Sequence, residues 1–254
     1  MNDIFENRKQ LNGKTQVPVW FMRQAGRYHD HYQNLKKSHD FMQLCKTPEL
    51  ACETTMGPIR EFDFDAAILF SDLLFPLEQL GTGLVYDPGP KLSLKISNMD
   101  DLKRLRQDGF SKDYYKFQKD ACTLLKKELP QDKTLLGFVG APFTLYAYAV
   151  EGAHAGSLVS SKTGLYDGRF ESFCELLLPN VLDEMKMQAE GGADAMCIFD
   201  TAVGELTVKD FTRIVLPKIK FLTSEFKKQF PNKKIIYYSR NTHKEHLRAI
   251  QDDN

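Results

Sequence analysis

The chain alternates short apolar runs with longer stretches in which apolar residues recur every three or four positions. The short runs predict buried strands, and the longer stretches predict helices that pack one face against a core. Five runs qualify as strands: Pro18–Met22, Asp65–Phe70, Leu135–Val139, Ala195–Phe199 and Lys234–Tyr238. Because helical stretches separate these runs, we expect parallel strand pairs and an α/β fold.

Several predicted helices carry start or stop signals. Thr47 offers a capping hydroxyl and Pro48 occupies the first helical position of a helix that should reach about Glu61. Other helices are expected within residues 100–129, from about Phe170, through residues 211–226 and from about Thr242. Pro179 should kink the helix that starts near Phe170, and Gly191-Gly192 should end it.

The remaining segments are polar or rich in turn residues. Residues 1–16 predict a polar helical lead-in, residues 81–94 a small hairpin and residues 158–168 a loop. Residues 28–45 are polar and partly helical, and their histidines share no helical face with Cys or Glu at metal-ligand spacing. We therefore interpret three side chains as solvated: His29, His31 and His39.

An α/β barrel of about 250 residues would use the whole chain, so we expect a single domain over residues 1–254. Such a barrel closes with eight strands, whereas we predict five before the chain stops. The prediction is therefore a (β/α)8 TIM barrel with about five of its eight βα units present. A doubly wound open sheet is the alternative.

Charge and cysteine content narrow the class of protein. With 34 basic and 34 acidic side chains, the chain has no global field that would draw nucleic acid or an anionic membrane. No apolar run approaches the roughly 18 residues of a membrane span, and the N-terminus lacks a signal-peptide core. Five cysteines without C-x-x-C spacing predict buried, reduced thiols in a cytoplasmic protein, and we expect neither a zinc site nor a catalytic thiol.

The candidate chemistry begins after the first predicted strand, in the run Arg23-Gln24-Ala25-Gly26-Arg27. In βα proteins, ligands bind at the turns that follow the carboxyl ends of strands. Two guanidiniums beside the permissive Gly26 form a grip for anions, because each offers planar, paired donors that match a carboxylate. A surface ion pair is the alternative for either arginine alone, and we favour ligand binding for the pair.

Other polar residues follow the later strands: Asp72, Tyr148, Asp200 and Thr201. A barrel gathers its strand ends at one mouth, so we expect these residues near the arginines. Asp72 either caps the next helix or accepts several N–H groups of a ligand as an ionised carboxylate. Arginines that bind carboxylates, arranged around an aspartate that accepts N–H groups, indicate a ligand with acidic groups outside and N–H groups at its centre. A reduced tetrapyrrole is such a ligand.

Four blocks of the sequence resemble the uroporphyrinogen decarboxylase family. They are PVWFMRQAGR at 18–27, AAILFSD at 66–72, GAPFTL at 140–145 followed by Tyr148 and Glu151-Gly152, and GADAMCIFDT at 192–201. The resemblance is collinear from about residue 4 to the end. It implies a cofactor-free TIM-barrel enzyme of haem biosynthesis, usually a homodimer, that removes CO₂ from the four acetate side chains of uroporphyrinogen III to give coproporphyrinogen III.

The same resemblance implies roles for individual residues. Arg23 and Arg27 would hold substrate carboxylates on the turn that Gln24, Ala25 and Gly26 complete. Asp72 would accept the pyrrole N–H groups and stabilise positive charge.

On the later strands, the resemblance implies that Tyr148 helps to position a carboxylate, and Thr201 stands where the family usually has serine. Residues 238–241 lack the glycine-bearing turn expected after the fifth strand. The family's last strands and its late active-site histidine have no counterpart, so we expect this chain alone to be inactive and poorly packed.

Two other functions stay open. One is a methyltransferase of the same superfamily that acts on a corrinoid or a thiol with zinc, which requires a His/Cys ligand set. The other is an inactive tetrapyrrole-binding fragment. Release of CO₂ from uroporphyrinogen without metal or corrinoid would separate the three.

Overall fold

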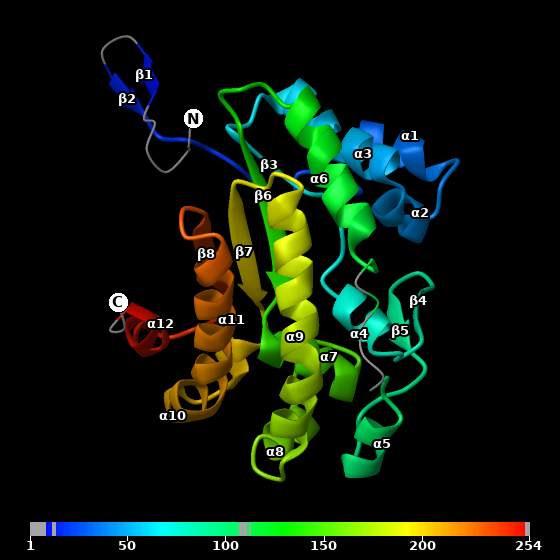
Figure 1. Cartoon of the computed structure of the whole chain (residues 1–254), viewed down its shortest axis with the longest axis vertical. Helices are drawn as coiled ribbons and strands as arrows, with labels where there is room; N and C mark the ends of the chain where they lie inside the picture. Colours follow the sequence, from blue (N-terminus) through cyan, green and yellow to red (C-terminus); the bar gives the residue numbers. More distant parts are fainter. Residues whose placement is uncertain (1–8, 12–13, 107–110, 112, 252–254) are drawn as a thin grey trace. The chain divides into compact units, whose positions relative to one another are not determined.

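The computed structural model describes residues 9–11, 14–106, 111 and 113–251, and it has an α/β fold (Figure 1). Its main sheet has four strands whose order follows the chain: β3 (Ala66–Ile68), β6 (Thr134–Gly140), β7 (Ala195–Asp200) and β8 (Lys234–Ser239). β3 and β6 are parallel, with Ala66 opposite Thr134. Every residue of β3, β6 and β7 is buried, which is typical of strands whose two faces are both covered.

Helices precede, separate and follow the strands of the main sheet along the chain. They are α1 (Asp30–Lys36), α2 (Phe41–Lys46), α3 (Pro48–Phe62), α4 (Phe75–Gln79), α5 (Met99–Lys103), α6 (Lys116–Glu128), α7 (Pro142–Glu151), α8 (Val159–Gly164), α9 (Arg169–Glu190), the 3-10 turn η1 (Val203–Glu205), α10 (Val208–Asp210), the π-helical segment η2 (Phe211–Val215), α11 (Leu216–Gln229) and α12 (Lys244–Gln251). Among the described residues, no helix has both the length and the apolar composition that crossing a bilayer requires.

The chain divides into two compact units, which we describe separately. Unit 1 comprises residues 1–72, 115–138 and 185–196, and unit 2 comprises residues 73–114, 139–184 and 197–254. In unit 1, α3 and α6 lie side by side (Figure 1). Their facing residues form a buried cluster with β3 and β6: Ala51, Cys52, Met56, Ile59, Ala67, Leu69, Ala121, Cys122, Leu125, Leu129, Leu135 and Ala193. Alanine and cysteine let the two helices approach each other closely.

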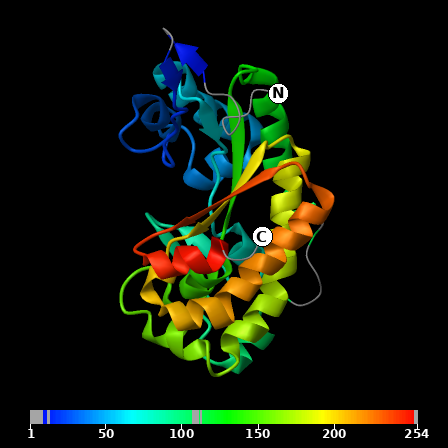
Figure 2. The same ribbon diagram turned by 90° about the vertical axis from the view of Figure 1, so that its left-hand side faces the viewer.

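Unit 2 contains α7, α8, α11 and α12 together with most of β7 and the whole of β8. The faces predicted from the period of the sequence are buried, including Phe211, Val215, Ile219, Leu222 and Phe226. α12 follows β8 and ends the described chain (Figure 2). The hairpin expected within residues 81–94 is confirmed as β4 (Leu84–Tyr86) paired antiparallel with β5 (Pro90–Leu92).

Two predicted elements and one predicted helix cap are wrong. In place of a helical lead-in, residues 9–11 and 14–16 form an antiparallel hairpin of β1 (Lys9–Leu11) and β2 (Lys14–Gln16); residues 1–8 and 12–13 lie outside the described residues. The predicted loop at 158–168 contains α8. Thr47 precedes α3 as expected, but its hydroxyl makes no capping hydrogen bond.

The predicted strand Pro18–Met22 is also absent, although the other four predicted strands are present. Val19 and Phe21 are 49% and 58% exposed, so the segment is not buried. Asp65, the residue before β3, makes two hydrogen bonds with this segment: it donates its N–H to the carbonyl of Val19 at 3.0 Å and accepts the N–H of Val19 at Oδ2 at 2.7 Å. An apolar run shows that a segment can form a strand, not that a partner strand pairs with it.

Candidate active site

The arginine turn of unit 1 is attached to the sheet by Gln24. Its carboxamide is 2% exposed, and it donates Nε2–H to the carbonyl of Ala66 at 2.6 Å while Oε1 accepts the N–H of Ile68 at 3.2 Å. These two backbone groups belong to the edge of β3 that faces away from β6. The carboxamide of Gln24 thus supplies hydrogen-bond partners to backbone groups at this edge of β3, where a neighbouring strand would otherwise supply them. Gln24 therefore holds the turn in place, which its sequence position alone did not indicate.

Other contacts close the turn around its backbone. The N–H of His29 donates to the carbonyl of Gly26 at 3.0 Å, and Nε2 of Gln33 donates to the carbonyl of Arg27 at 2.6 Å. The Tyr28 hydroxyl donates to the carbonyl of Gln24. Gly26 does not have a positive φ, and a Cβ there would meet only ordinary contact with the Tyr28 ring, at 3.5 Å. The permissive backbone that we expected of Gly26 is therefore not needed here.

Arg23 and Arg27 are both exposed on this turn. Among the described residues, neither guanidinium forms an ion pair with a carboxylate, so the surface ion pair considered from the sequence is not found. Arg27 lies near the hydroxyl of Tyr32, where its charge opposes the rise in the Tyr32 pKa that burial causes. The turn thus presents two cations whose charges the described carboxylates of the chain leave uncompensated.

His29 follows the turn and contradicts our interpretation of it as solvated. It is 2% exposed, and its Nε2 lies 2.6 Å from Oε2 of Glu61 at the end of α3. His31, half-buried on α1, lies 3.2 Å from a carboxylate oxygen of Glu53. Both rings therefore tie the segment after the arginines to α3.

Asp72 ends the first of the three segments that make up unit 1, and it is half-buried. It is not the cap of the next helix, because α4 has Leu74 at its N-cap and receives no side-chain cap. Its negative charge reaches Cys45, whose pKa is raised well above the ordinary value by burial and then by Asp72. The capping role considered from the sequence is therefore not found, and the role of Asp72 as an acceptor of ligand N–H groups stays a prediction.

In unit 2, a buried network surrounds Asp200 at the end of β7. The carboxylate is fully buried and accepts hydrogen bonds from the Thr144 hydroxyl at Oδ1 and the Tyr237 hydroxyl at Oδ2, both at 2.8 Å. The Thr144 oxygen in turn accepts the N–H of Ala202 at 3.1 Å. Burial raises the pKa of Asp200 to about 6, although both hydroxyls oppose the rise. The network links α7, β7 and β8. Thr201, which directly follows Asp200 in the chain, is half-buried.

The loop after β8 has no glycine, as the sequence showed. Two other residues, Asn241 and Gly204, allow the backbone of this loop to turn and to pack closely. Asn241 adopts a left-handed φ of 56°, a conformation that asparagine tolerates better than most residues. Gly204, on the loop after β7, allows the close approach: a Cβ there would lie 2.2 Å from the carbonyl oxygen of Arg240.

Tyr148 lies in the last turn of α7, and its hydroxyl is 2.5 Å from Nδ1 of His154. No feature of the sequence singled out His154, because it stands in an ordinary Gly-Ala-His-Ala-Gly loop. Of the residues predicted for the site, the structure brings Arg23, Gln24, Ala25, Gly26 and Arg27 together on one turn of unit 1, which also contains Asp72. Tyr148 and Thr201 belong to unit 2.

All five cysteines are free thiols and buried, as predicted. Burial raises the pKa of both Cys52 and Cys197 to about 12, and it also raises the pKa of Cys174. Thiolates are the reactive form, so these side chains are poor nucleophiles.

The fold and these residues define an α/β protein whose polar groups follow the carboxyl ends of strands in a parallel sheet. A family model described as "Uroporphyrinogen decarboxylase (URO-D)" matches residues 8–254, and the chain belongs to this family.

Relatives that carry the name uroporphyrinogen decarboxylase agree with this assignment. The protein from Carboxydothermus hydrogenoformans is 36% identical over 89% of this chain and 66% of its own length. The protein from Geobacter sp. (strain M21) is 41% identical over 79% of this chain and 60% of its own length. The one from Drosophila virilis is 40% identical over 77% of this chain and 51% of its own length. This chain thus spans about half to two thirds of these relatives.

Among solved structures, a methyltransferase from Methanosarcina mazei superposes with a TM-score of 0.61 and covers 84% of this chain and 64% of that chain. The sequence identity is 15%, so this similarity concerns the fold alone.

Proposed function

We propose that this protein is a carboxy-lyase that removes CO₂ from the acetate side chains of uroporphyrinogen III to give coproporphyrinogen III. The observation that carries the proposal is the turn on which Gln24 fixes two exposed arginines that have no acidic partner among the described residues. A substrate with many carboxylates would supply those partners. Family membership and the named relatives support the same reaction.

In this proposal, the paired guanidiniums bind substrate carboxylates through parallel N–H donors. Asp72 accepts the pyrrole N–H groups, and Tyr148 and Thr201 contribute hydroxyls. At each acetate side chain the overall reaction replaces the carboxylate with a hydrogen. A proton enters, CO₂ leaves, and CH₂–COO⁻ becomes CH₃.

Loss of CO₂ leaves an electron pair that needs an acceptor. Protonation of a pyrrole α-carbon makes the ring cationic, and the ring then takes up the electron pair from the breaking C–C bond. The negative charge of Asp72 would stabilise this cation more than it stabilises the neutral ring, which is the requirement for lowering the barrier. Arginine's high pKa makes it a reluctant proton donor, so a water or a substrate carboxyl held by an arginine is the better donor.

We further propose that the four strands belong to an eight-stranded (β/α) barrel, that the protein is a cytoplasmic homodimer when full length, and that the reaction uses no cofactor. The methyltransferase alternative is not favoured, because among the described residues no three His, Cys, Asp or Glu side chains lie close enough together to hold a metal ion.

The test incubates the purified chain anaerobically with uroporphyrinogen III in a chelating buffer without corrinoid, and measures CO₂ and the carboxyl number of the products. In contrast to the sequence-based expectation that the chain alone is inactive, this proposal predicts CO₂ release and stepwise appearance of porphyrinogens with seven, six, five and four carboxyl groups. The Geobacter relative serves as a positive control for the substrate. Failure of this chain where the relative turns over would contradict the proposal.

A further inference from the structure

The contact between Tyr148 and His154 depends on the shape of a loop. The two residues are six positions apart, a separation that places side chains on different faces of a helix, yet their rings lie 5.1 Å apart and the Tyr148 hydroxyl is 2.5 Å from Nδ1 of His154. Both side chains are half-buried. The loop of residues 152–158 must therefore turn back over the end of α7.

Three left-handed residues give the loop this shape. Gly152, Gly156 and Leu158 have φ values of 80°, 106° and 47°. At Gly152 a Cβ would lie 2.8 Å from Nζ of Lys95, the far end of a flexible side chain that donates to the carbonyl of Glu151 at 2.9 Å, so the positive φ is what requires glycine there. Leu158 is a costly residue at such a φ, and its burial against the core holds it there.

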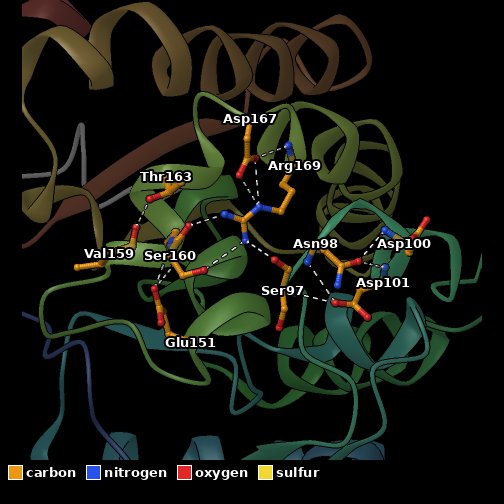
Figure 3. A network of polar contacts seen from close by, with 11 residues as sticks. Ser97, Asn98, Asp100, Asp101, Glu151, Val159, Ser160, Thr163, Asp167 and Arg169 are labelled. Atoms are coloured by element: carbon orange, nitrogen blue, oxygen red, sulfur yellow. Dashed lines mark hydrogen bonds and ion pairs between the residues drawn. The ribbon is translucent and has the colours of Figure 1, made fainter.

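A network of polar contacts fixes both ends of the loop (Figure 3). Before the loop, Oε1 of Glu151 accepts the N–H and the hydroxyl of Ser161 at 3.0 and 3.1 Å. Beyond it, the buried guanidinium of Arg169 donates to the carbonyls of Ser97 and Ser160 at 3.1 and 3.0 Å and pairs with Asp167 at 2.9 Å. α8, between these anchors, thus has a fixed position, and the loop presents His154 to Tyr148.

A tyrosine hydroxyl has one hydrogen. The position of the ring hydrogen on His154 therefore decides whether Tyr148 donates its own hydrogen to His154 or to a ligand. When the hydrogen of the neutral ring is on Nε2, Nδ1 accepts the Tyr148 hydrogen, and the phenol has only lone pairs to offer to a ligand. When the ring hydrogen is on Nδ1, His154 donates to the phenol oxygen, and the phenol donates onward. Only the second arrangement binds an anionic carboxylate.

We propose that His154 is a positioning residue that sets Tyr148 as a hydrogen-bond donor to a substrate carboxylate. This inference rests on the proposed function for the identity of the ligand. Binding moves the ring hydrogen of His154 from Nε2 to Nδ1 through solvent, so the number of protons is unchanged. The chain Nδ1–H···Oη–H···carboxylate is then complete, and each donor in it polarises the next.

The test is a double-mutant cycle read by binding of uroporphyrin III, the stable oxidised ligand, through its fluorescence. We expect Tyr148→Phe and His154→Phe each to weaken binding about tenfold, the value of one hydrogen bond to a charged group. The double variant should be no weaker than either single variant, because both remove the same donor. His154→Asn, whose amide can donate to the phenol, should stay within about threefold of wild type, and His39→Asn serves as the control.

The inference would be overturned if the losses of affinity in the two single variants multiply in the double variant. It would also be overturned if His154→Phe binds uroporphyrin as tightly as wild type at an unchanged melting temperature, or if wild type does not bind uroporphyrin. A second readout is the ¹⁵N resonance of His154 Nδ1. It should move from an unprotonated to a protonated value when uroporphyrin is added to wild type but not to Tyr148→Phe, and no movement in wild type contradicts the proposal.

These outcomes separate this inference from the proposed function, since binding requires no turnover. Coupled binding without CO₂ release would refute the decarboxylase proposal alone. CO₂ release with multiplying losses would refute the role of His154 alone.

Discussion

Arg23 and Arg27 differ from Arg60 and Arg169, whose guanidiniums bind carboxylates of Glu53 and Asp167 within the chain. The role proposed for the pair depends on geometry as well as charge, because only guanidinium offers two parallel donors to one carboxylate. We predict that Arg23→Lys and Arg27→Lys each raise the KM for uroporphyrinogen or lower turnover about tenfold. Steady-state kinetics measures this.

Two results qualify that prediction. Lys91→Arg, at an exposed ion pair, should leave the kinetics unchanged. Lysine variants of the turn that match wild type would show that net charge suffices and that paired donors play no part.

Asp200 gives a prediction about pH. Its pKa in the folded protein is about 6, above that of an ordinary unfolded aspartate, so between about pH 4 and 6 the folded state holds a proton that the unfolded state has lost. The free energy of unfolding should therefore fall as pH rises across this window and then level off. The difference in pKa corresponds to on the order of 3 kcal/mol.

The variant Asp200→Asn cannot ionise, so it should remove this part of the pH dependence. Urea denaturation of wild type and variant between pH 4 and 8 measures the slopes, and Asp87→Asn at an exposed site is the control. The same slope in Asp200→Asn and wild type would mean that the Asp200 pKa is not raised.

At the scale of elements, Gln24 substitutes for a strand at the edge of β3. The variant Gln24→Met keeps the approximate shape but leaves the carbonyl of Ala66 and the N–H of Ile68 without their partner. Each buried polar group left unsatisfied costs ~1–3 kcal/mol, so we predict a loss of about 2–4 kcal/mol in the free energy of unfolding. Amide exchange at Ile68 should accelerate as well.

The matched control is Gln33→Met, because the exposed Gln33 also donates its carboxamide to a backbone carbonyl, that of Arg27. It should cost well under 1 kcal/mol, as is usual for surface substitutions. If both variants are equally stable, Gln24 does not support the sheet edge.

The elements that were predicted best from the sequence are those whose burial follows from their own run of apolar residues. The strands at Leu135–Val139 and Ala195–Phe199 are buried at every position, and α3 starts at Pro48 as expected. The segment Pro18–Met22 is also apolar, yet its residues are exposed or half-buried, because whether it is paired depends on the rest of the fold.

Elements that rely on distant polar contacts were not predictable from the local pattern. α8 has no apolar periodicity, and Glu151 and Arg169 hold it from outside. His154 meets Tyr148 only because a loop with three left-handed residues turns it back. At the candidate site, the arginine turn was identified from its residue types and spacing, whereas the support that Gln24 gives it required the structure.

At the scale of the whole molecule, the buried thiols lie in both units: Cys45, Cys52 and Cys122 in unit 1, and Cys174 and Cys197 in unit 2. Burial and raised pKa values both suppress reaction with electrophiles. We predict that iodoacetamide at pH 7.5 modifies no cysteine of the native protein within an hour, that activity survives the treatment, and that all five react in denaturant.

Mass spectrometry of peptides assigns the modified positions. Rapid modification of one cysteine in the native protein, with loss of activity and protection by substrate, would revive a thiol or metal mechanism.

We propose that this chain binds a polyacidic, N–H-rich ring and decarboxylates it with Asp72 as the acceptor for the ring N–H groups. The most direct measurement compares wild type with Asp72→Asn, which keeps the size of the side chain and removes its charge, in anaerobic turnover of uroporphyrinogen III followed by separation of the products by carboxyl number. Wild type should accumulate the four-carboxyl product, and Asp72→Asn should be slower by about 100-fold or more, on the order of 3 kcal/mol in the barrier, at an unchanged melting temperature. Near-normal turnover by Asp72→Asn would show that the charge of Asp72 does not stabilise the cationic ring.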